Sequence, residues 1–410
     1  MKLLLINHYA GSPKHGMEFR PFYLAREWVR TGHQALILGA SYSHVRTTQP
    51  EPGMAAMSGV NYLFYDTPEY QGNGTGRVKN IWSFCRQVWK DADILAREFA
   101  PDVVIASSTY PMDIWVARRV AKLAKAKLVY EVHDLWPLSP IELSGMSKWH
   151  PFAMLCQKAE NDAYRDADVV VSMLPKVHQH MAAHGLDLKK LHIVPNGITL
   201  DEWSEDGEPL DAAIQAHLAA ERAAGRTVVG YAGSMGEPNA LDVLLDAAKR
   251  LKDTKSAESA ALSFVLVGGG HLRDQLEARV RDEGLTNVAM FPAIPKAQIP
   301  SLLKGFDIAY IGWQRTPIYR FGIAPNKLMD YMMAQRPVLH SVEAGNDPVA
   351  EAGAGLTVPP QDPKAVADGL LQLAAVPADE RAAMGRRGRE FVLANHTYPV
   401  LAQRFIAAVS

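Results

Sequence analysis

Residues 320–332 read RFGIAPNKLMDYM and combine an amide, a cation and a carboxylate at helical spacing. A loop with glycine and proline is expected to lead into a helix that starts near Asn326, and Asp330 follows one turn later on nearly the same face as Lys327. Helix N-termini offer unpaired N–H groups and partial positive charge to an anion. A carboxylate further along can accept hydrogen bonds from a ribose diol. The segment suggests a nucleotide site, with an ordinary amphipathic helix as the alternative.

Short apolar runs alternate with helical patterns along the chain, which favours doubly wound parallel sheets with helices on both faces. The expected strands are 2–6, 34–38, 103–106, 128–132, 169–171 and 191–194, followed by 227–232, 263–267, 288–291, 308–311, 337–339 and 355–358. The expected helices include 18–31, 80–100, 113–126, 152–165, 241–251, 272–283, 298–304, 326–334 and 363–373.

The length of 410 residues exceeds the size at which a single core usually stops growing. The stretch 201–209 is acidic and lacks apolar periodicity, so we expect the boundary between two α/β domains near it. We assign residues 1–205 to the first domain and 206–390 to the second, with a helix at about 391–410 that packs back on the first. Two Rossmann-like, doubly wound domains would direct the carboxyl ends of both sheets toward one interdomain cleft, where ligands bind.

Composition excludes several classes of protein. A hydrophobic fraction of 48% and a charged fraction of 21% are typical of a globular protein, and a net charge of −1 argues against nucleic-acid binding. Cys85 and Cys156 provide neither a disulfide framework nor clustered metal ligands, so we expect a cytoplasmic location. The apolar run at 2–6 is too short for a signal sequence, and no stretch approaches the roughly 20 apolar residues of a membrane span.

The first strand is expected to end in a loop in which Gly16 precedes a helix. A glycine there would let the backbone approach a phosphate or sugar closely. We therefore include Gly16, Met17 and Glu18 among the candidate substrate-binding residues; a flexible loop without such a role is the alternative.

His133 and Asp134 directly follow the strand at 128–132. Strand ends of this kind face the ligand crevice. A histidine there can bond a hydroxyl or stabilise developing charge, and a neighbouring carboxylate, Asp134, can set its tautomer. We name both as candidate catalytic residues; a satisfied structural histidine is the alternative.

Two glycine turns follow consecutive strands of the second half. Residues 233–236 read GSMG and residues 268–270 read GGG. Their amides could hold a diphosphate. Gly233, Ser234 and Gly269 are therefore candidate donor-binding residues.

Together these features resemble the two-domain GT-B glycosyltransferases of the large retaining family 4, over nearly the whole chain. The resemblance rests on EVHD at 131–134, VPNG at 194–197, the glycine turns and the loop and helix at 320–332. Residues 16–21, 41–44 and 320–327 are similar to the WbuB-like branch. That branch works in bacterial O-antigen and capsule assembly and is linked with N-acetylated amino sugars.

The resemblance implies a retaining hexosyltransferase that moves a sugar, an N-acetylated amino sugar in this branch, from a UDP-sugar to a lipid-linked or saccharide acceptor. It implies no cofactor and no metal, and the absence of an Asp-x-Asp motif from the expected cleft segments agrees with this. His133 would orient or stabilise the donor sugar. Lys327, and second Arg320, would hold the diphosphate and Asp330 the ribose. Ile323 and Asn326 complete the substrate-binding candidates.

The chain departs from the family pattern at two places. The first of two glutamates that many members carry falls on Gly322, and the Arg and Lys of the turn after the first C-terminal strand are replaced by Ser234 and Asn239. We expect Arg320 and Lys327 to substitute for that basic pair. Two alternatives stay open: a UDP-N-acetylglucosamine 2-epimerase-like enzyme, and a non-catalytic partner subunit that binds a nucleotide sugar.

Residues 77–127 contain ten lysines and arginines, interleaved in part with aromatic residues. Such a face could dock at an anionic bilayer, at the inner face of the plasma membrane. For Trp82 and Trp89 we favour the alternative, a core-facing aromatic stripe with a solvated basic back.

Overall fold

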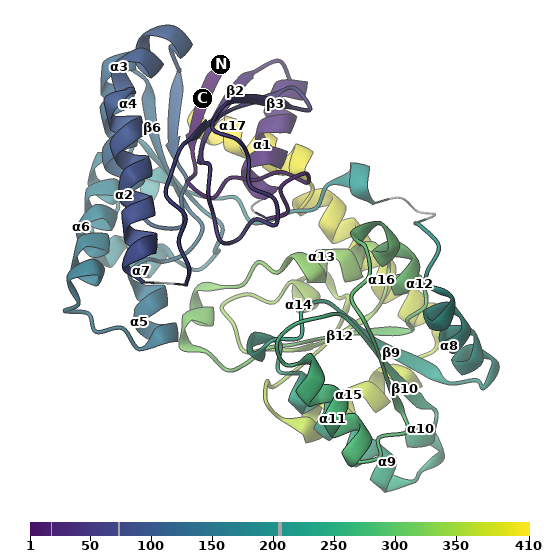
Figure 1. Ribbon diagram of the computed structural model, residues 1–410. Helices are drawn as coiled ribbons and strands as arrows, with labels where there is room; N and C mark the ends of the chain where they lie inside the picture. Colours follow the sequence, from purple (N-terminus) through teal and green to yellow (C-terminus); the bar gives the residue numbers. More distant parts are fainter. Residues whose placement is uncertain (18, 73, 204–206) are drawn as a thin grey trace. The chain divides into compact units, whose positions relative to one another are not determined.

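The computed structural model describes residues 1–17, 19–72, 74–203 and 207–410 (Figure 1). They form two compact units: unit 1 comprises residues 1–196 and 398–410, and unit 2 comprises residues 197–397. Each unit is an α/β domain built on a largely parallel sheet, which confirms the expected fold class. We expected the domains to meet at 205/206 and the returning helix to begin near residue 391; the units divide after Asn196 and after Thr397.

Unit 1 contains an eight-stranded sheet in the order β3-β4-β2-β1-β5-β6-β7-β8, parallel except for the β3–β4 pair. Its strands are β1 (Lys2–Ile6), β2 (Gln34–Ala40), β3 (Gly53–Met57), β4 (Val60–Tyr65), β5 (Val103–Ala106), β6 (Lys127–Val132), β7 (Val169–Ser172) and β8 (Leu191–Ile193).

Six of these strands were expected, and the β3–β4 hairpin was missed. Its turn residues Ser58 and Gly59 both have positive φ, 49° and 80°, as a two-residue hairpin turn with the right twist requires. The sequence of β3, GMAAM, lacks the β-branched and aromatic residues that signal a strand. Pairing with β4 therefore decides its conformation.

The helices of unit 1 cover both faces of this sheet. They are α1 (Phe19–Arg30), α2 (Thr75–Lys90), α3 (Ala92–Ile94) with a π-helical turn (Leu95–Phe99), α4 (Asp113–Ala124), α5 (Leu138–Ser144), α6 (Pro151–Asp166), α7 (His178–Ala183) and α17 (Tyr398–Val409). The last helix belongs to this unit because its aromatic rings pack on those of α1. The ring centres of Tyr398 and Tyr23 are 4.8 Å apart, and those of Phe405 and Trp28 are 5.1 Å apart.

Unit 2 contains a six-stranded, wholly parallel sheet in the order β11-β10-β9-β12-β13-β14. Its strands are β9 (Thr227–Ala232), β10 (Leu262–Val267), β11 (Val288–Phe291), β12 (Ile308–Gly312), β13 (Val338–Ser341) and β14 (Gly355–Val358). All six were expected, because strands buried on both faces read as continuous apolar runs.

The helices of unit 2 are α8 (Ala212–Ala223), α9 (Leu241–Thr254), α10 (Ala257–Ala260), α11 (Arg273–Asp282), α12 (Ile299–Lys304), α13 (Asn326–Met333), α14 (Pro348–Ala352), α15 (Pro363–Ala375) and α16 (Ala378–Asn395). Helix α13 is joined to the end of β9 by Tyr331. Its hydroxyl accepts from the N–H of Ala232 at 2.8 Å and donates to the carbonyl of the same residue at 3.0 Å. These two bonds hold α13 against the end of β9.

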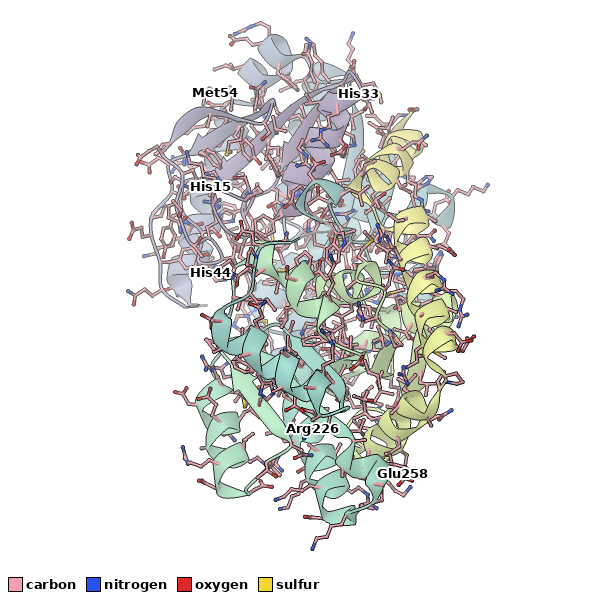
Figure 2. All side chains as sticks on the ribbon, turned by 90° about the vertical axis from the view of Figure 1, so that its right-hand side faces the viewer. His15, His33, His44, Met54, Arg226 and Glu258 are labelled. Carbon is pink, nitrogen blue, oxygen red and sulfur yellow. The ribbon has the colours of Figure 1, made fainter. Side chains whose placement is uncertain are left out.

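Labelled residues in Figure 2 mark both ends of the unit 1 sheet and the amino end of the unit 2 sheet. In unit 1, His33 precedes β2, whereas His44 follows it and lies at the same end as His15. In unit 2, Arg226 and Glu258 precede β9 and β10 and mark the amino end of that sheet. Within the part of the chain that the structure describes, no helix is both long and apolar enough to cross a bilayer.

Candidate functional site

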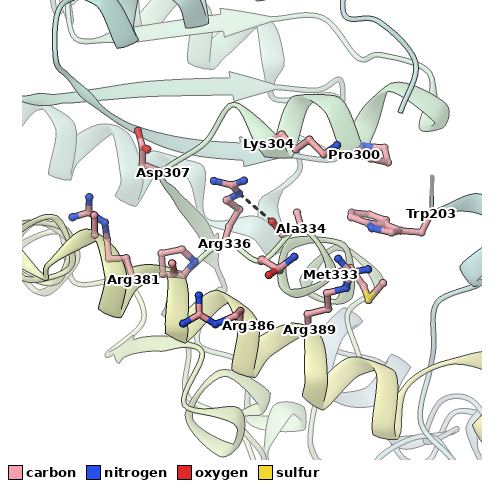
Figure 3. Close-up of a pocket in the computed structure, with 14 residues that line it drawn as sticks. Trp203, Pro300, Lys304, Asp307, Met333, Ala334, Arg336, Arg381, Arg386 and Arg389 are labelled. Atoms are coloured by element: carbon pink, nitrogen blue, oxygen red, sulfur yellow. Dashed lines mark hydrogen bonds between the residues drawn. The ribbon is translucent and has the colours of Figure 1, made fainter. Parts of the chain in front are cut away.

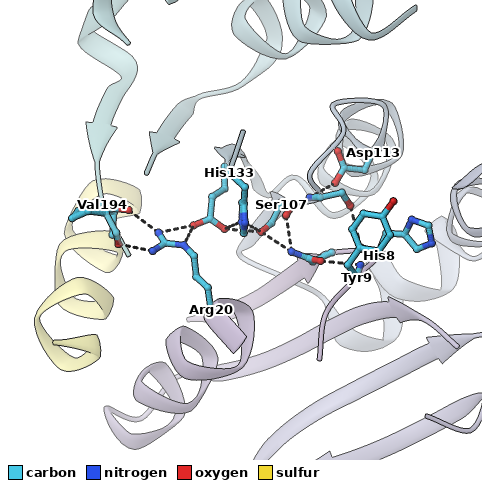
Figure 4. Close-up of polar contacts among 11 residues, drawn as sticks. His8, Tyr9, Arg20, Ser107, Asp113, His133 and Val194 are labelled. Carbon is cyan, nitrogen blue, oxygen red and sulfur yellow. Dashed lines mark hydrogen bonds and ion pairs between the residues drawn. The ribbon is translucent and has the colours of Figure 1, made fainter. Parts of the chain in front are cut away.

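A buried ion pair lies at the carboxyl end of the unit 1 sheet. The carboxylate of Glu131, in β6, accepts hydrogen bonds from Nε and Nη2 of Arg20 at 3.0 and 2.9 Å. The same guanidinium donates to the carbonyl oxygens of Val194 and Pro195 at 2.8 and 2.6 Å (Figure 4). Burial opposes ionisation of Glu131, but the charge of Arg20 helps to outweigh it and the pKa of this carboxyl lies well below its usual range. The pair joins α1, β6 and the chain after β8.

His133, directly after β6, is held by the same carboxylate. Its Nε2 lies 3.2 Å from Oε2 of Glu131 and 3.0 Å from the hydroxyl of Ser107, which itself donates to Oε2 at 2.6 Å. Because the serine proton is used on Glu131, Nε2 of His133 must donate, and Nδ1 is the acceptor in the neutral ring. Among the described residues Nδ1 has no hydrogen-bond partner, and the side chain is 10% exposed. A ligand hydroxyl could bond this edge.

The carboxylate that orients His133 is therefore Glu131, and the expectation that Asp134 would do so is corrected. Residues two apart in a strand share a face, which brings Glu131 and His133 together. Asp134 instead accepts a hydrogen bond from Oγ of Ser139 at 2.9 Å, and burial raises its pKa. Its catalytic role stays a prediction.

A second layer of contacts supports Ser107 from the strands beside it. Nδ2 of Asn7 donates to the Ser107 carbonyl at 2.7 Å. The N–H of Ser108 donates to Asp113 at 2.9 Å, and the N–H of His8 donates to the Ser108 hydroxyl at 3.1 Å (Figure 4). Burial raises the pKa of Asp113 to about 7. We had nominated none of these residues, nor Arg20 and Glu131; the spacing of Glu131 and His133 was the one available signal.

The loop with Gly16 folds onto a second loop of unit 1. Gly16 has a φ of 103°, and a Cβ built on it would lie 2.4 Å from Oγ1 of Thr47. Packing between loops is thus sufficient to require glycine, and contact with a sugar or phosphate stays a prediction. Met17 is 51% exposed beside it. Glu18 lies outside the described residues.

Lys327, in the first turn of α13, points at the loop after β9. Its ammonium donates to the hydroxyl of Tyr231 at 2.9 Å and to Oδ1 of Asn239. It lies 3.4 Å from the position of a Cβ on Gly233. Burial lowers the pKa of Lys327 to about 8, and none of the described carboxylates pairs with it. A cation that is largely buried among neutral groups is placed to receive an anion.

The two glycine turns of unit 2 lie against each other beside this ammonium. A Cβ on Gly268 would lie 1.9 Å from the carbonyl oxygen of Gly233, and the N–H of Met235 donates to the Gly269 carbonyl at 2.7 Å. The N–H groups of Ser234 and Gly269 have no hydrogen-bond partner in the described part of the chain. Unpaired amides in neighbouring turns are groups that can bind an anion, and this role for Ser234 and Gly269 stays a prediction.

The other candidates of residues 320–332 have different surroundings. Ile323 is buried, and its N–H and carbonyl are both bonded by the Asn346 amide, at 2.7 and 3.1 Å. Asn326 is exposed at the first position of α13. Asp330 lines a small pocket together with Lys296. The structure thus gives Lys327 and Asp330 separate sets of neighbours.

Arg320 lies in a 3-10 helix (Pro317–Phe321) and is exposed. Its Nη1 donates to the carbonyl of Pro317 at 2.7 Å, and its guanidinium lies 4.3 Å from the centre of the Phe321 ring. These described contacts fall within its own turn. Its role as a phosphate ligand stays a prediction.

The described residues that line a cavity of about 490 Å³ in unit 2 include none of these candidates (Figure 3). Asp307 and Arg336, just before β12 and β13, line it, so it is at the amino end of the sheet, whereas ligands of such sheets bind at the carboxyl end. Its other cationic lining residues are Lys304, Arg381, Arg386 and Arg389. We therefore do not assign the donor to it.

The aromatic residues of α2 correct one expectation. Trp82 and Trp89 are 60% and 44% exposed, so they do not form a core-facing stripe; Ile81, Phe84 and Val88 face the core instead. The guanidinium of Arg119 lies 4.9 Å from the Trp89 ring centre. We call the hollow around this pair the tryptophan–arginine surface; it is lined by Trp89, Trp115, Arg118, Arg119, Lys122 and Leu123.

Two family models match this chain. The glycosyl transferase 4-like domain matches residues 15–197, and the glycosyl transferases group 1 domain matches residues 226–375. Together they cover most of both units, so the chain belongs to the glycosyltransferases that combine these two domains. Its two Rossmann-like domains are those of the GT-B fold.

Named relatives agree with this assignment. "Putative colanic acid biosynthesis glycosyl transferase WcaI" of Escherichia coli (strain K12) is 23% identical over 266 residues, 63% of each chain, so the match spans less than two thirds of that relative. The structure of HepE from Anabaena in complex with UDP and glucose is 15% identical, with a TM-score of 0.66 over 99% of this chain and 98% of that one. An E. coli structure named trehalose-6-phosphate, bound with UDP-2-fluoro glucose, is 12% identical, with a TM-score of 0.71 over 100% and 99%.

Proposed function

We propose that this protein transfers a sugar from a UDP-activated donor to an acceptor hydroxyl, with retention of anomeric configuration. The observation that carries the proposal is the ammonium of Lys327, buried without a described carboxylate beside the amides of the two glycine turns. A diphosphate placed there would restore the charge balance that burial removes. The site thus suits the leaving group of a nucleotide sugar.

In this reaction the bond from the anomeric carbon to the β-phosphate oxygen breaks, and the acceptor oxygen bonds that carbon on the same face. The acceptor proton passes to the leaving phosphate. Negative charge grows on the diphosphate in the transition state, where Lys327 and the amides of Ser234 and Gly269 would stabilise it. These groups supply the stabilisation that a metal provides elsewhere, so we propose a reaction that needs no metal or cofactor.

Lys327 replaces the basic pair that many family members carry in the turn after the first C-terminal strand. Asn239 stands at one of those positions and accepts a hydrogen bond from Lys327, so a cation from α13 reaches the same loop. Arg320 is kept as the second candidate for this role. Asp330 is proposed for the ribose hydroxyls, with Ile323 and Asn326 beside it in sequence.

We propose that His133 contacts the donor sugar, because its Nδ1 can accept a hydrogen bond from a sugar hydroxyl. Asp134 is kept as a second candidate catalytic residue. In unit 1, Gly16 and Met17 are proposed as substrate contacts. Gly233 is proposed to allow close approach of the diphosphate in unit 2.

We propose that the donor carries an N-acetylated amino sugar and that the acceptor is lipid-linked or a saccharide in surface polysaccharide synthesis. The likeness of residues 16–21, 41–44 and 320–327 to the WbuB-like branch and the name of WcaI support this. The UDP complexes of HepE and of the E. coli structure support the choice of UDP.

Contact with an anionic membrane, at the inner face of the plasma membrane, is proposed for the tryptophan–arginine surface. An exposed tryptophan, Trp89, beside Arg118, Arg119 and Lys122 suits the boundary between headgroups and acyl chains. In flotation with phosphatidylglycerol vesicles, a W89A/R119A double variant should lose most of the binding of the wild type, while R97A, at an exposed arginine that pairs with Glu98, should keep it. Equal flotation with neutral vesicles would remove this part of the proposal.

The transfer reaction is tested with a panel of UDP-, GDP- and TDP-sugars, with and without a membrane lipid extract, by measuring nucleotide release. Acceptor-dependent release of UDP is expected from the wild type. K327A should lose on the order of 100-fold in kcat/KM, the usual effect of removing a group that stabilises an oxyanion. K252A, at a lysine that bonds the Gly284 carbonyl, is the matched control. Full activity of K327A would overturn the assignment, and isomerisation of the donor without acceptor would indicate an epimerase.

A further inference from the structure

Three side chains of metal-binding type converge in unit 1 outside the site described above. They are Glu160 on α6, His180 on α7 and His184 directly after α7. One coordinating atom of each lies within 4.8 Å of the other two, and Nε2 of His180 is 3.7 Å from Oε1 of Glu160. The two histidines are four positions apart, the spacing at which two imidazoles on one helix face bind zinc.

The tautomer of His184 suits a metal ligand. Its Nδ1 lies 2.8 Å from the carbonyl oxygen of His180 and must donate to it, since a carbonyl can only accept. The neutral ring then carries its lone pair on Nε2. Histidines that bind metals commonly donate their other ring N–H to a carbonyl, which sets both the tautomer and the orientation of the ring.

Glu160 is the buried acidic member of this cluster. Its side chain is 2% exposed, and its oxygens accept hydrogen bonds from the Tyr164 hydroxyl at 2.9 Å and from Nε2 of Gln157 at 2.7 Å. No lysine or arginine of residues 1–17, 19–72, 74–203 and 207–410 forms an ion pair with it. Neutral donors orient a buried carboxylate but do not balance its charge. The bond from His184 to the His180 carbonyl brings a second imidazole within 4.8 Å of this carboxylate.

We propose that Glu160, His180 and His184 bind one zinc ion. One carboxylate and two imidazoles are the protein donor set of open zinc sites, in which water takes the fourth position. Ligand atoms about 2.0–2.2 Å from a tetrahedral ion lie about 3.4 Å from one another, so the side chains need to close by roughly 1 Å. The hydrogen bonds from Tyr164 and Gln157 would hold the carboxylate as it binds.

The ion would join α6 to α7 and so stabilise the chain between β7 and β8. It has no part in the proposed transfer reaction, and the zinc proposal does not depend on that function. Residues Val194 and Pro195, whose carbonyls bind Arg20, follow β8. The zinc site would therefore support unit 1 from the segment that leads into this contact.

The experiment compares the full-length wild type with the variants H184Q and H178Q after removal of metal by a chelator. His178 is an exposed histidine of the same helix and serves as the matched control. Titration calorimetry with Zn²⁺ should give one site per chain in the wild type and in H178Q, and H184Q should lose it. At a hundredfold excess of Zn²⁺ over its dissociation constant, the Tm of the wild type should rise by about 5 °C or more, with no rise in H184Q.

The variant H184Q separates zinc binding from a simple ion pair, because it leaves Glu160 and His180 in place. If their pair is the whole role of the cluster, H184Q and the wild type will respond to Zn²⁺ alike, and the proposal fails. Absence of binding to the stripped wild type would also overturn it. With Co²⁺ in place of Zn²⁺, the visible absorption of a four-coordinate ion should appear in the wild type and not in H184Q.

Discussion

His133 and Glu131 stand two positions apart at the end of β6, and Nε2 of the histidine lies 3.2 Å from the glutamate carboxylate. Because this contact uses Nε2, the opposite edge of the ring is the part that can meet a sugar hydroxyl. Replacing His133 by alanine should lower kcat by on the order of 100-fold, as expected for loss of a group that acts on the reacting sugar. UDP carries no donor sugar, so its affinity, measured by calorimetry, should stay unchanged.

The contribution of this histidine should also depend on Ser107, which bonds both Glu131 and His133. The variant S107A should lower kcat by about tenfold, within the range of a lost positioning hydrogen bond. The same change combined with H133A should add little, since the two act through one ring. Independent, additive losses would show that Ser107 acts elsewhere.

The ion pair of Arg20 and Glu131 is expected to stabilise the folded chain in addition to holding the site together. Removing Arg20, as R20M, leaves a buried carboxylate uncompensated and should cost about 3–5 kcal/mol in the free energy of unfolding. R97M, at an exposed pair with Glu98, should cost less than about 1 kcal/mol. Urea denaturation followed by circular dichroism measures both. Similar values for the two variants would contradict the assigned burial.

This ion pair should also make the free energy of unfolding depend on pH. The pKa of Glu131 is lowered in the folded chain, so the unfolded state binds the extra proton as pH falls. The stabilisation is therefore present above the unfolded pKa of about 4.3 and lost progressively below it. The difference in unfolding free energy between wild type and E131Q should shrink from pH 7 toward pH 3.

The lowered pKa of Lys327 predicts that the affinity for UDP also depends on pH. Its pKa of about 8 means that the free site loses its charge as pH rises through that value, whereas a bound diphosphate would keep the ammonium protonated. UDP affinity should be nearly constant between pH 6 and about 7.5 and fall by up to about tenfold per pH unit above about 8. An arginine stays charged throughout, so K327R should show no such fall. If UDP affinity fell equally in K327R, the titrating group would be a residue other than Lys327.

Two single-methyl substitutions in the turn at residues 268–270 test whether this turn contacts the ligand. G268A would place a Cβ 1.9 Å from the carbonyl of Gly233, so it should both lower Tm and abolish UDP binding. G269A meets its nearest neighbour, the Cβ of Ala293, only at 3.7 Å, so its Tm should stay close to that of the wild type. Any loss of UDP affinity in G269A would then show that the bound ligand lies close to this residue. Unchanged UDP binding in G268A would exclude these turns from the site.

The two α/β domains and nearly all of their parallel strands can be predicted from the sequence. Strands buried on both faces must be apolar throughout, so segments such as Lys2–Ile6 and Leu262–Val267 are recognisable without their neighbours. The ends of these strands also indicated where His133 and the glycine turns lie, because ligand sites of such sheets follow the carboxyl ends.

Which side chains contact one another follows from the folded chain and not from any local sequence pattern. Arg20 and Glu131 are 111 positions apart, and Lys327 and Asn239 are 88 apart, so no local pattern links them. The β3 strand depends on its pairing with β4 in the same way. Local propensity and periodicity are short-range properties of a chain. Which carboxylate orients a histidine, and which cation reaches a loop, is set by contacts between segments that only the folded chain brings together.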